Sequence, residues 1–272
     1  MSRIIAVANQ KGGVGKTTTA VNLAACLAVA EKRTLVIDTD PQGNATSGLG
    51  ISKDEVQRSV YDVLVEGVPL SEVIRREVHF PFLDVAPATQ DLVGVEVELV
   101  GRRAREGVLR EALREVRDDY DFILVDCPPS LGMLTLNTLT AADAVLIPIQ
   151  CEFYALEGLS QLLNTVRIVQ KNLNEALQID GVLLTMYDGR LNLSKQVAEE
   201  AKEYFGPKVY RTAIPRNVRI AEAPSFGKPI VLYDILSIGA KSYLALAKEV
   251  IARSGARGAE PTKPRLASGA VR

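Results

Sequence analysis

The sequence predicts one α/β domain built on a mostly parallel, twisted sheet of about seven or eight strands with helices on both faces. Short apolar runs alternate with longer stretches of helix-forming residues along the 272 residues, and no long antiparallel stretch interrupts the alternation. Parallel sheets bury both of their faces, so their strands appear as continuous apolar runs. Hydrophobic residues make up 47% of the chain, which is enough to fill one sizeable core. The length also allows two small domains, but the regular alternation favours one.

The expected strands are apolar runs bounded by polar or turn-forming residues. They cover residues 4–8, 34–38, 82–86, 120–126, 144–149 and 179–186, with a short strand starting at 209–210. Helices are expected at 20–28, 91–98, 105–117, 155–173, 192–205 and 240–253, with short helical pieces near 60–64 and 70–75. Residues 1–253 therefore form one predicted domain, and the Gly-, Pro-, Ala- and Arg-rich residues 254–272 form a disordered tail.

The most informative stretch lies between the first strand and the first helix, from Asn9 to Thr19. Strand, glycine-rich turn, Lys-Thr and helix is the arrangement of a phosphate-binding loop, in which backbone N–H groups and the helix N-terminus face an anion. Lys16 is placed to reach the β- and γ-phosphates of a nucleotide, and the Thr17 hydroxyl to ligate Mg²⁺. The general G-x-x-x-x-G-K-[ST] pattern is incomplete, because its first glycine is replaced by Gln10. The predicted phosphate-binding residues are Lys11, Gly12, Gly13, Val14, Gly15, Lys16, Thr17 and Thr18.

Three aspartates follow expected strands, at the sheet edge where ligands bind in doubly wound folds. Asp38 and Asp40 follow the second strand, and Asp126 closes an apolar run in the arrangement of a Walker B motif. Asp38 and Asp126 are therefore candidates for supporting Mg²⁺, and Asp40 for orienting the attacking water. Two simpler interpretations stay open: Asp38 could stabilise an Asx-type turn before Pro41, and Asp126 could merely cap its strand.

Composition limits the possible functions. The net charge of −1 provides no global attraction for nucleic acid, so a DNA-binding surface would have to be a local patch. The three cysteines are widely spaced in apolar surroundings, which favours a reduced cytosolic compartment over a disulfide framework. The first strand starts at once, which leaves no room for a signal peptide, and no apolar run approaches the ~20 residues that span a bilayer. We therefore expect a cytoplasmic protein.

Several motifs together resemble those of the ParA family, and in particular of the small bacterial ParA proteins of the Soj branch. The glycine-rich loop carries a second lysine, Lys11, as in the deviant Walker A motif of the ParA/MinD superfamily. The resemblance implies a P-loop NTPase domain whose activity is Mg²⁺-dependent ATP hydrolysis, slow without a partner, with ATP/ADP and Mg²⁺ as cofactors. It implies a role in partitioning chromosomes or plasmids. The match covers about residues 1–252 and is carried by segments 9–18, 38–44, 126–129, 188–190, 215–219 and 222–229.

By the same resemblance, the protein alternates between a monomer and an ATP-bound sandwich homodimer that binds double-stranded DNA without sequence preference. A ParB-type centromere-binding partner stimulates hydrolysis, and the protein is nucleoid-associated. Lys11 crosses the dimer interface to the partner's nucleotide, where a cation supports phosphoryl transfer. Gly12 lies where the two loops approach each other, so a Cβ would intrude. Lys11, Lys16 and Asp40 are the catalytic residues of this hypothesis.

The resemblance also implies an adenine site and a DNA-binding surface in the last third of the chain. The adenine site lies between the end of the sixth expected strand and Pro215, Arg216 and Asn217, where Asn217 or backbone groups contact the base edge. Arg190 and Arg219 match positions at which this branch carries DNA-contacting arginines. Dimerisation would double a modest basic patch, which gives a physical reason for ATP to switch on DNA binding.

Two other functions use the same scaffold. A MinD-type membrane-cycling ATPase needs an amphipathic C-terminal helix, which the Pro- and Gly-rich residues 254–272 cannot form, so we expect no membrane binding. The second is a metabolic enzyme or metal carrier, such as a relative of the nitrogenase iron protein or of dethiobiotin synthetase. A shared iron–sulfur cluster would need two cysteines per subunit near the dimer axis. Cys127 alone follows a nucleotide-site motif, and a core thiol is its simpler interpretation.

Overall fold

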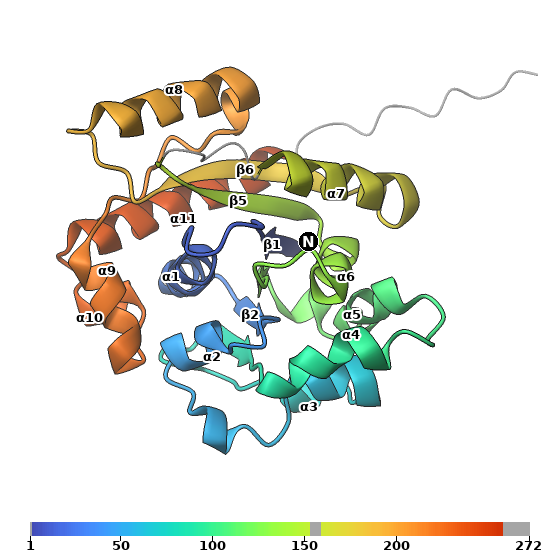
Figure 1. The fold of residues 1–272 in the computed structure, drawn as a ribbon. Coiled ribbons are helices and arrows are strands. Elements are labelled where there is room, and N and C mark those ends of the chain that lie inside the picture. The colour runs from blue at the N-terminus through green and yellow to red at the C-terminus, as the bar shows by residue number, and fades with distance from the viewer. Residues whose placement is uncertain (1, 153–158, 258–272) are drawn as a thin grey trace, which may run out of the picture.

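The computed structural model describes residues 2–152 and 159–257, and in that part of the chain six parallel strands form one sheet in the order β3-β2-β4-β1-β5-β6 (Figure 1). All neighbouring pairs are parallel. The strands are β1 (Arg3–Val7), β2 (Thr34–Asp38), β3 (Leu83–Ala86), β4 (Phe122–Asp126), β5 (Ala144–Gln150) and β6 (Gln178–Thr185). The α/β class and the parallel sheet are confirmed.

The predicted count of about seven or eight strands is wrong for the described residues, whose sheet has six strands. The expected short strand at 209–210 makes an isolated bridge between Val209 and Val182. Beyond it, the backbone N–H groups of Arg211 and Thr212 donate to the Glu249 carboxylate, at 3.0 and 3.1 Å, instead of to a strand. The N–H groups of Tyr210 and Ile214 still donate to β6 carbonyls, at 2.9 and 2.8 Å, so the Glu249 side chain interrupts the pairing at Thr212 between them.

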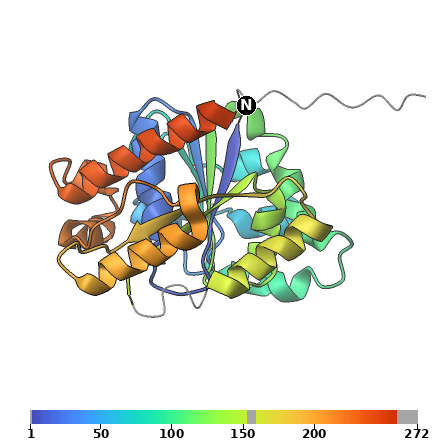
Figure 2. The same cartoon turned by 90° about the horizontal axis from the view of Figure 1, so that it is seen from above.

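Helices cover both faces of the sheet, as Figure 2 shows from above. The buried cluster on one face includes side chains of α1 (Lys16–Val29), α2 (Asn44–Gly48), α9 (Val218–Glu222), α10 (Ile230–Tyr233) and α11 (Ile238–Arg257). The cluster on the other face includes side chains of α3 (Leu70–Val73), α4 (Val95–Glu98), α5 (Val108–Leu113), α6 (Met133–Ala141), α7 (Leu159–Asn172) and α8 (Asn192–Phe205).

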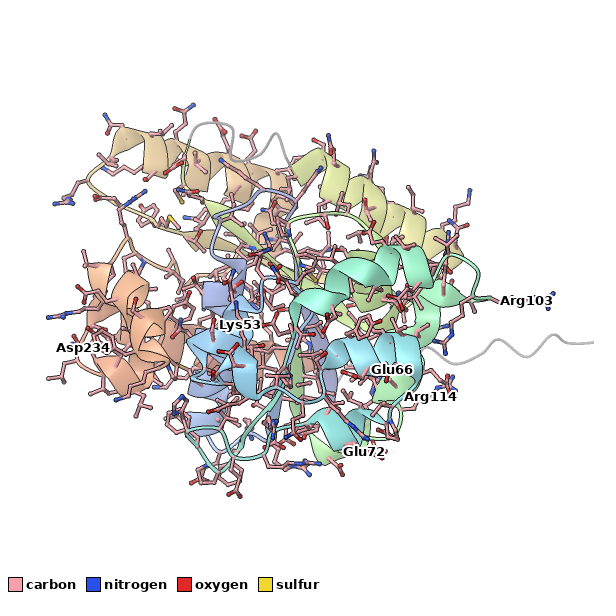
Figure 3. All side chains as sticks on the ribbon, turned by 60° about the horizontal axis from the view of Figure 1, so that its bottom comes forward. Lys53, Glu66, Glu72, Arg103, Arg114 and Asp234 are labelled. Atoms are coloured by element: carbon pink, nitrogen blue, oxygen red, sulfur yellow. The ribbon has the colours of Figure 1, made fainter. Side chains whose placement is uncertain are left out.

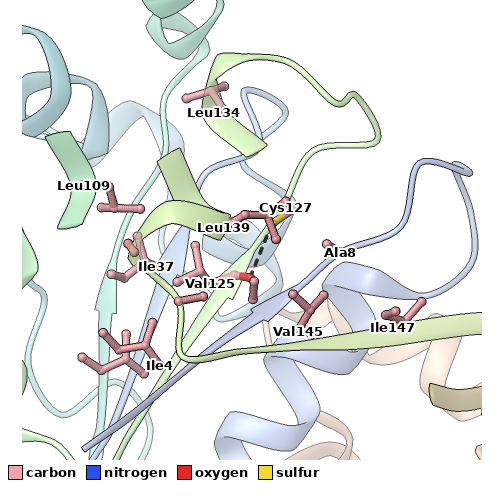
Figure 4. Close-up of a cluster of buried hydrophobic side chains, with 14 of the residues drawn as sticks. Ile4, Ala8, Ile37, Leu109, Val125, Cys127, Leu134, Leu139, Val145 and Ile147 are labelled. Carbon is pink, nitrogen blue, oxygen red and sulfur yellow. Dashed lines mark hydrogen bonds between the residues drawn. The ribbon is translucent and has the colours of Figure 1, made fainter. Parts of the chain in front are cut away.

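Alternating side chains of each strand supply these two clusters. In β1, Ile4 and Ala6 point into one cluster, whereas Ile5 and Val7 point into the other. Figure 4 shows part of the cluster that contains Ile4, on the face covered by α3 to α8, with Ile4 beside side chains from neighbouring strands. Burial of both faces explains why the strands read as unbroken apolar runs.

Several helices differ from the sequence-based expectation. The segment 91–98 divides into a 3-10 turn (Gln90–Gly94) followed by α4, and the helix expected at 105–117 shortens to α5 after a 3-10 turn at Arg105–Gly107. Helix α6 was not expected at all. The start of the helix expected at 155 lies outside the described residues. Helix α11 continues to Arg257, beyond the predicted domain boundary at 253, and the rest of the predicted tail, 258–272, also lies outside the described residues.

The strand order brings the functional motifs to one edge. Strand β1 lies between β4 and β5, so the chain leaves β1 toward one half of the sheet and later returns to the other. In this register Val7 pairs with Asp126, and Asp126 pairs with Asp38. The ends of β1, β2 and β4 therefore meet at a topological switch point, where ligands bind in open α/β sheets.

A buried asparagine joins α1 to α10 and provides a test of the fold. Asn22 accepts a hydrogen bond from the Ile230 N–H at 2.6 Å and donates to the Thr18 carbonyl at 2.8 Å. We expect Asn22→Ala to lower the free energy of unfolding by about 2 kcal/mol, because a buried N–H loses its acceptor. Urea denaturation measures the change. Asn172→Ala is the control, because it removes an exposed local hydrogen bond to Ile168 and should change the free energy of unfolding by less than about 0.5 kcal/mol. Equal losses in the two variants would contradict this role of Asn22.

Candidate functional site

The glycine-rich loop joins β1 to α1 and curves at two glycines in the left-handed region, Gly13 (φ +73°) and Gly15 (φ +86°). Two side chains that the sequence analysis did not single out hold it. Asn9 accepts a hydrogen bond from the Lys11 N–H at 3.0 Å and donates to the Pro148 carbonyl at 2.7 Å. The Thr185 hydroxyl donates to the Val14 carbonyl at 2.8 Å. Strands β5 and β6 thus both brace the loop, which leaves its N–H groups to face an anion.

Lys16 opens α1 and is buried, with 6% of its surface exposed. Its ammonium donates to the Lys11 carbonyl at 3.1 Å. Burial lowers the pKa of Lys16, although the nearby carboxylates of Asp126 and Asp40 oppose the shift. A desolvated cation beside a phosphate-binding loop gains free energy when it meets phosphate oxygens.

Asp126 is the most unusual side chain of this edge. Both carboxylate oxygens are buried, and among the described residues neither has a hydrogen-bond partner of normal geometry. Burial and the neighbouring Asp38 raise its pKa well above the usual range, while the nearby Thr17 hydroxyl and Lys16 lower it. A buried carboxylate without donors is costly unless something else satisfies it. A hydrated cation would do so.

Asp38 and Asp40 are brought together with Asp126, but their oxygens are engaged differently. Asp38 Oδ2 accepts two hydrogen bonds from Thr46, and Oδ1 accepts one from the Asp40 N–H at 3.1 Å. Burial raises the pKa of Asp38 to about 6, against the lowering effect of these bonds. Asp40 Oδ1 accepts from the Gln42 N–H at 2.9 Å, which is an Asx-type turn. Asp38 therefore organises the loop from within, and Asp40 lies at its turn.

No group of three or more carboxylate, thiol or imidazole side chains in the described residues is arranged to hold a metal ion by itself. Mg²⁺ in nucleotide sites keeps several waters and takes phosphate oxygens as further ligands. The Thr17 hydroxyl beside the unpaired Asp126 fits that kind of site, with Asp126 acting through water. Asp38, whose oxygens already accept three hydrogen bonds, fits a supporting position behind it.

Lys11 and Gly12 lie on the outer side of the loop. Lys11 is half-buried and Gly12 is exposed. A Cβ placed on Gly12 would meet no heavy atom within 4 Å, and its φ is not in the left-handed region. Within the described part of one chain, nothing therefore requires glycine at this position.

A cavity of about 300 Å³ opens beside the loop, between the end of β6 and α9. The predicted adenine-contacting residues Pro215, Arg216 and Asn217 line it together with Gly15 and Thr18. The Asn217 side-chain oxygen caps α9 by accepting from the Ile220 N–H at 3.3 Å, so its amide N–H₂ group is the part left for a ligand. The remaining lining is mostly apolar: Thr185, Met186, Ile214, Ile220, Ala221, Pro224 and Tyr243. A flat aromatic base suits such a lining.

Arg190 and Arg219 belong to two segments that the backbone joins through the Tyr187–Pro215 bridge. Both side chains are exposed, 89% and 55%, and both pair with carboxylates of their own chain. Arg190 forms a two-pronged pair with Asp188, which lowers the pKa of that carboxyl to about 2. Arg219 pairs with Glu222 at 3.1 Å. Neither arginine contributes a free positive charge.

Two observations bear on the alternative functions. Burial raises the pKa of the Cys127 thiol to about 12, and Cys26 and Cys151 are also buried, so all three behave as core side chains. In the described residues no helix combines the length and the apolar character needed to cross a bilayer.

Comparison with known proteins agrees with this geometry. A family model described as an AAA domain matches residues 2–179. The sporulation initiation inhibitor protein Soj of Bacillus subtilis is 62% identical over 252 residues, covering 93% of this chain and 99% of Soj. The chromosome partitioning protein ParA of Myxococcus xanthus is 56% identical over 253 residues, covering 93% of this chain and 89% of its own.

Solved structures share the fold. Cobyrinic acid a,c-diamide synthase from Mycobacterium smegmatis, with bound ADP and magnesium, has a TM-score of 0.83 and 37% identity, covering 97% of this chain and 100% of that one. A putative plasmid partition protein from Borrelia burgdorferi bound to AMPPNP has a TM-score of 0.78 and 26% identity, covering 93% and 100%. Sequence identity, coverage and the arrangement of the loop together show that the chain belongs to the ParA/Soj family of chromosome-partitioning ATPases.

Proposed function

We propose that this protein binds ATP with Mg²⁺ at the β1–α1 loop and hydrolyses it slowly when no partner is bound. The observation that carries the proposal is the buried carboxylate of Asp126, beside Thr17 and Lys16, whose oxygens have no hydrogen-bond partner of normal geometry among the described residues. A magnesium ion held by Thr17 and phosphate oxygens would place a water against Asp126. Bound Mg²⁺ would neutralise phosphate charge during transfer. The ADP–magnesium and AMPPNP complexes of the structural relatives support the choice of ligand.

In this proposal Lys16 binds the β- and γ-phosphates, and Asp40 orients the attacking water. Asp40 is nearly buried (7% exposed) and its loop is held by internal hydrogen bonds, so its carboxylate has a defined direction. A carboxylate near the γ-phosphate accepts a hydrogen bond from water and aligns it for in-line attack.

The dimer provides the second part of the proposal. Two chains meet across their bound nucleotides, and each Lys11 reaches the nucleotide of the partner subunit. Gly12 would then be glycine because of the partner, since its own chain leaves room for a side chain. Each subunit completes the other's site, so ATP becomes part of the interface.

DNA binding and partner stimulation complete the cycle. The paired patches of Arg190 and Arg219 would grip DNA phosphates without reading bases, and this would place the protein on the nucleoid. A ParB-type protein bound at centromere-like sites would stimulate hydrolysis and release the dimer. The partitioning relatives Soj and ParA support this assignment.

Asp40→Ala tests the hydrolytic step. We expect ATP binding to persist while turnover falls by about 100-fold, because the water loses its orienting carboxylate. Phosphate release and fluorescent ATP binding measure the two effects. Asp54→Ala, which alters an exposed aspartate in the neighbouring turn, should leave both unchanged. Near-normal turnover by Asp40→Ala would remove Asp40 from the mechanism.

Gly12→Val tests the interface. We expect an unchanged melting temperature and ATP affinity but no ATP-dependent dimer, because the new side chain meets only the partner. Light scattering after size exclusion, in an Asp40→Ala background that retains ATP, measures the dimer. Gly101→Val is the matched control, since Gly101 also has open space around its Cβ position. A normal ATP dimer of Gly12→Val would refute this arrangement of the loops.

Arg190→Ala combined with Arg219→Ala tests the DNA surface. We expect the dimer to form and its DNA affinity to fall at least about tenfold. The dimer loses four phosphate contacts, two in each subunit, and each contact contributes about one to the slope of log K against log salt. The slope should therefore decrease in magnitude by roughly three to four. Fluorescence anisotropy at several salt concentrations measures both. Arg114 (Figure 3) is an exposed arginine at the C-cap of α5 that also pairs with a neighbouring glutamate, and Arg114→Ala should change neither value. An unchanged salt slope in the double variant would place the DNA surface elsewhere.

A further inference from the structure

Thr46 is a fully buried residue of α2 (0% exposed) that joins three parts of the site edge. Its backbone N–H and its hydroxyl both donate to Asp38 Oδ2, each at 2.8 Å. The same hydroxyl accepts a hydrogen bond from the backbone N–H of Ala88, beyond the end of β3, at 2.9 Å. One side chain thus connects the ends of β2 and β3 with the first helix after the Asp40 loop.

The orientation of the Asp38 carboxylate in turn helps to fix the backbone of Asp40. Two donors on Oδ2 leave the Asp38 carboxylate one orientation, in which Oδ1 accepts from the Asp40 N–H at 3.1 Å. The Asp40 side chain is then held by the Gln42 N–H. The hydrogen bonds that join the Thr46 hydroxyl to Asp38, and Asp38 to the Asp40 N–H, therefore lie between buried groups, and only the bond from the Gln42 N–H involves an exposed residue. Such bonds hold their geometry better than exposed ones.

We propose that Thr46 is a positioning residue for ATP hydrolysis: through Asp38 it keeps Asp40 in the direction that in-line attack by water requires. This inference rests on the proposed role of Asp40. Alignment matters more than charge here, since a shift of about 1 Å in a reacting group costs up to about 100-fold in rate. Thr46 touches neither phosphate nor water in this account, so substrate binding should not depend on its hydroxyl.

Thr46→Val keeps the shape of the side chain and removes the hydroxyl. We expect kcat to fall about tenfold while KM and the affinity for a fluorescent ATP analogue stay within twofold. Thr46→Ser, which retains the hydroxyl, should restore kcat to within threefold of the original chain. Thr34→Val is the matched control, because Thr34 is equally buried at the opposite end of β2 and its hydroxyl bonds to the Lys32 carbonyl. That variant should keep kcat unchanged.

Two results would overturn the inference: an unchanged kcat in Thr46→Val, or a parallel loss of ATP affinity, which would indicate a general structural role. Should Thr46→Val fail to fold, Thr46→Ala is measured in its place, because it removes the hydroxyl without placing a methyl group against Asp38. Turnover by the unaltered chain is the reference. If the unaltered chain does not hydrolyse ATP, the proposed function itself is contradicted. If it does, and the Thr46 variants hydrolyse ATP at the same rate, only the positioning role is contradicted.

Discussion

The arrangement at the sheet edge depends on a buried carboxylate that the described part of the chain leaves without full hydrogen bonding. Asp126 is buried at the end of a central strand, and among the described residues no donor of normal geometry meets its oxygens. Lys16 is buried close by, with a pKa lowered by the same loss of water. The two charges attract each other, yet neither is fully compensated, and such groups are expensive to keep in a protein interior. A ligand that brings both anionic oxygens and a hydrated cation relieves both groups at once.

The rest of the fold keeps this edge rigid before any ligand arrives. Asn9 and Thr185 tie the glycine-rich loop to β5 and β6, while Thr39 donates its hydroxyl to the Asp126 carbonyl at 2.6 Å. These bonds run between the ends of parallel strands, which are themselves held by apolar contacts on both faces. Loops on such a scaffold meet their ligand with little loss of conformational entropy. The buried charged groups of the site are thus a few side chains, whereas the apolar clusters hold the strands in place.

The elements best predicted from the sequence were those with unambiguous periodicity. Strand β2 and helix α8 have the bounds that were expected, because one is an apolar run with sharp polar ends and the other alternates apolar and charged residues at helical spacing. Helix α6 was missed because its Leu-Thr-Leu-Asn-Thr pattern is buried nearly all round and has no polar face to reveal a period. The supposed seventh strand was lost to the Glu249 carboxylate, which lies far along the chain.

At the site, too, the sequence reveals residues that belong to a motif, but not residues that matter only through their contacts in the fold. The glycine-rich loop and the three aspartates could be found by motif, since the chemistry demands those residue types at those spacings. Asn9 and Thr46 carry no such signal, because an asparagine or threonine near a turn is ordinary in sequence and becomes important only through what it contacts. Nor could the sequence reveal that the Asp126 oxygens lack hydrogen-bond partners of normal geometry among the described residues, because that depends on which donors the fold brings near them.

If the proposed DNA surface is right, the pairing of its arginines with carboxylates of the same chain gives a physical reason for DNA binding to depend on ATP. Arg190 pairs with Asp188, and Arg219 pairs with Glu222 and Asp234, so a DNA phosphate would have to compete with these carboxylates for each proposed contact. Exposed ion pairs of this kind contribute little to stability, so a phosphate can replace the carboxylate. One subunit would therefore bind DNA weakly. Two patches held together by the proposed ATP interface would act at high effective concentration toward the same duplex, and the gain would multiply rather than add. In the proposed cycle, weak binding by a single patch would make the dependence of DNA binding on ATP steep.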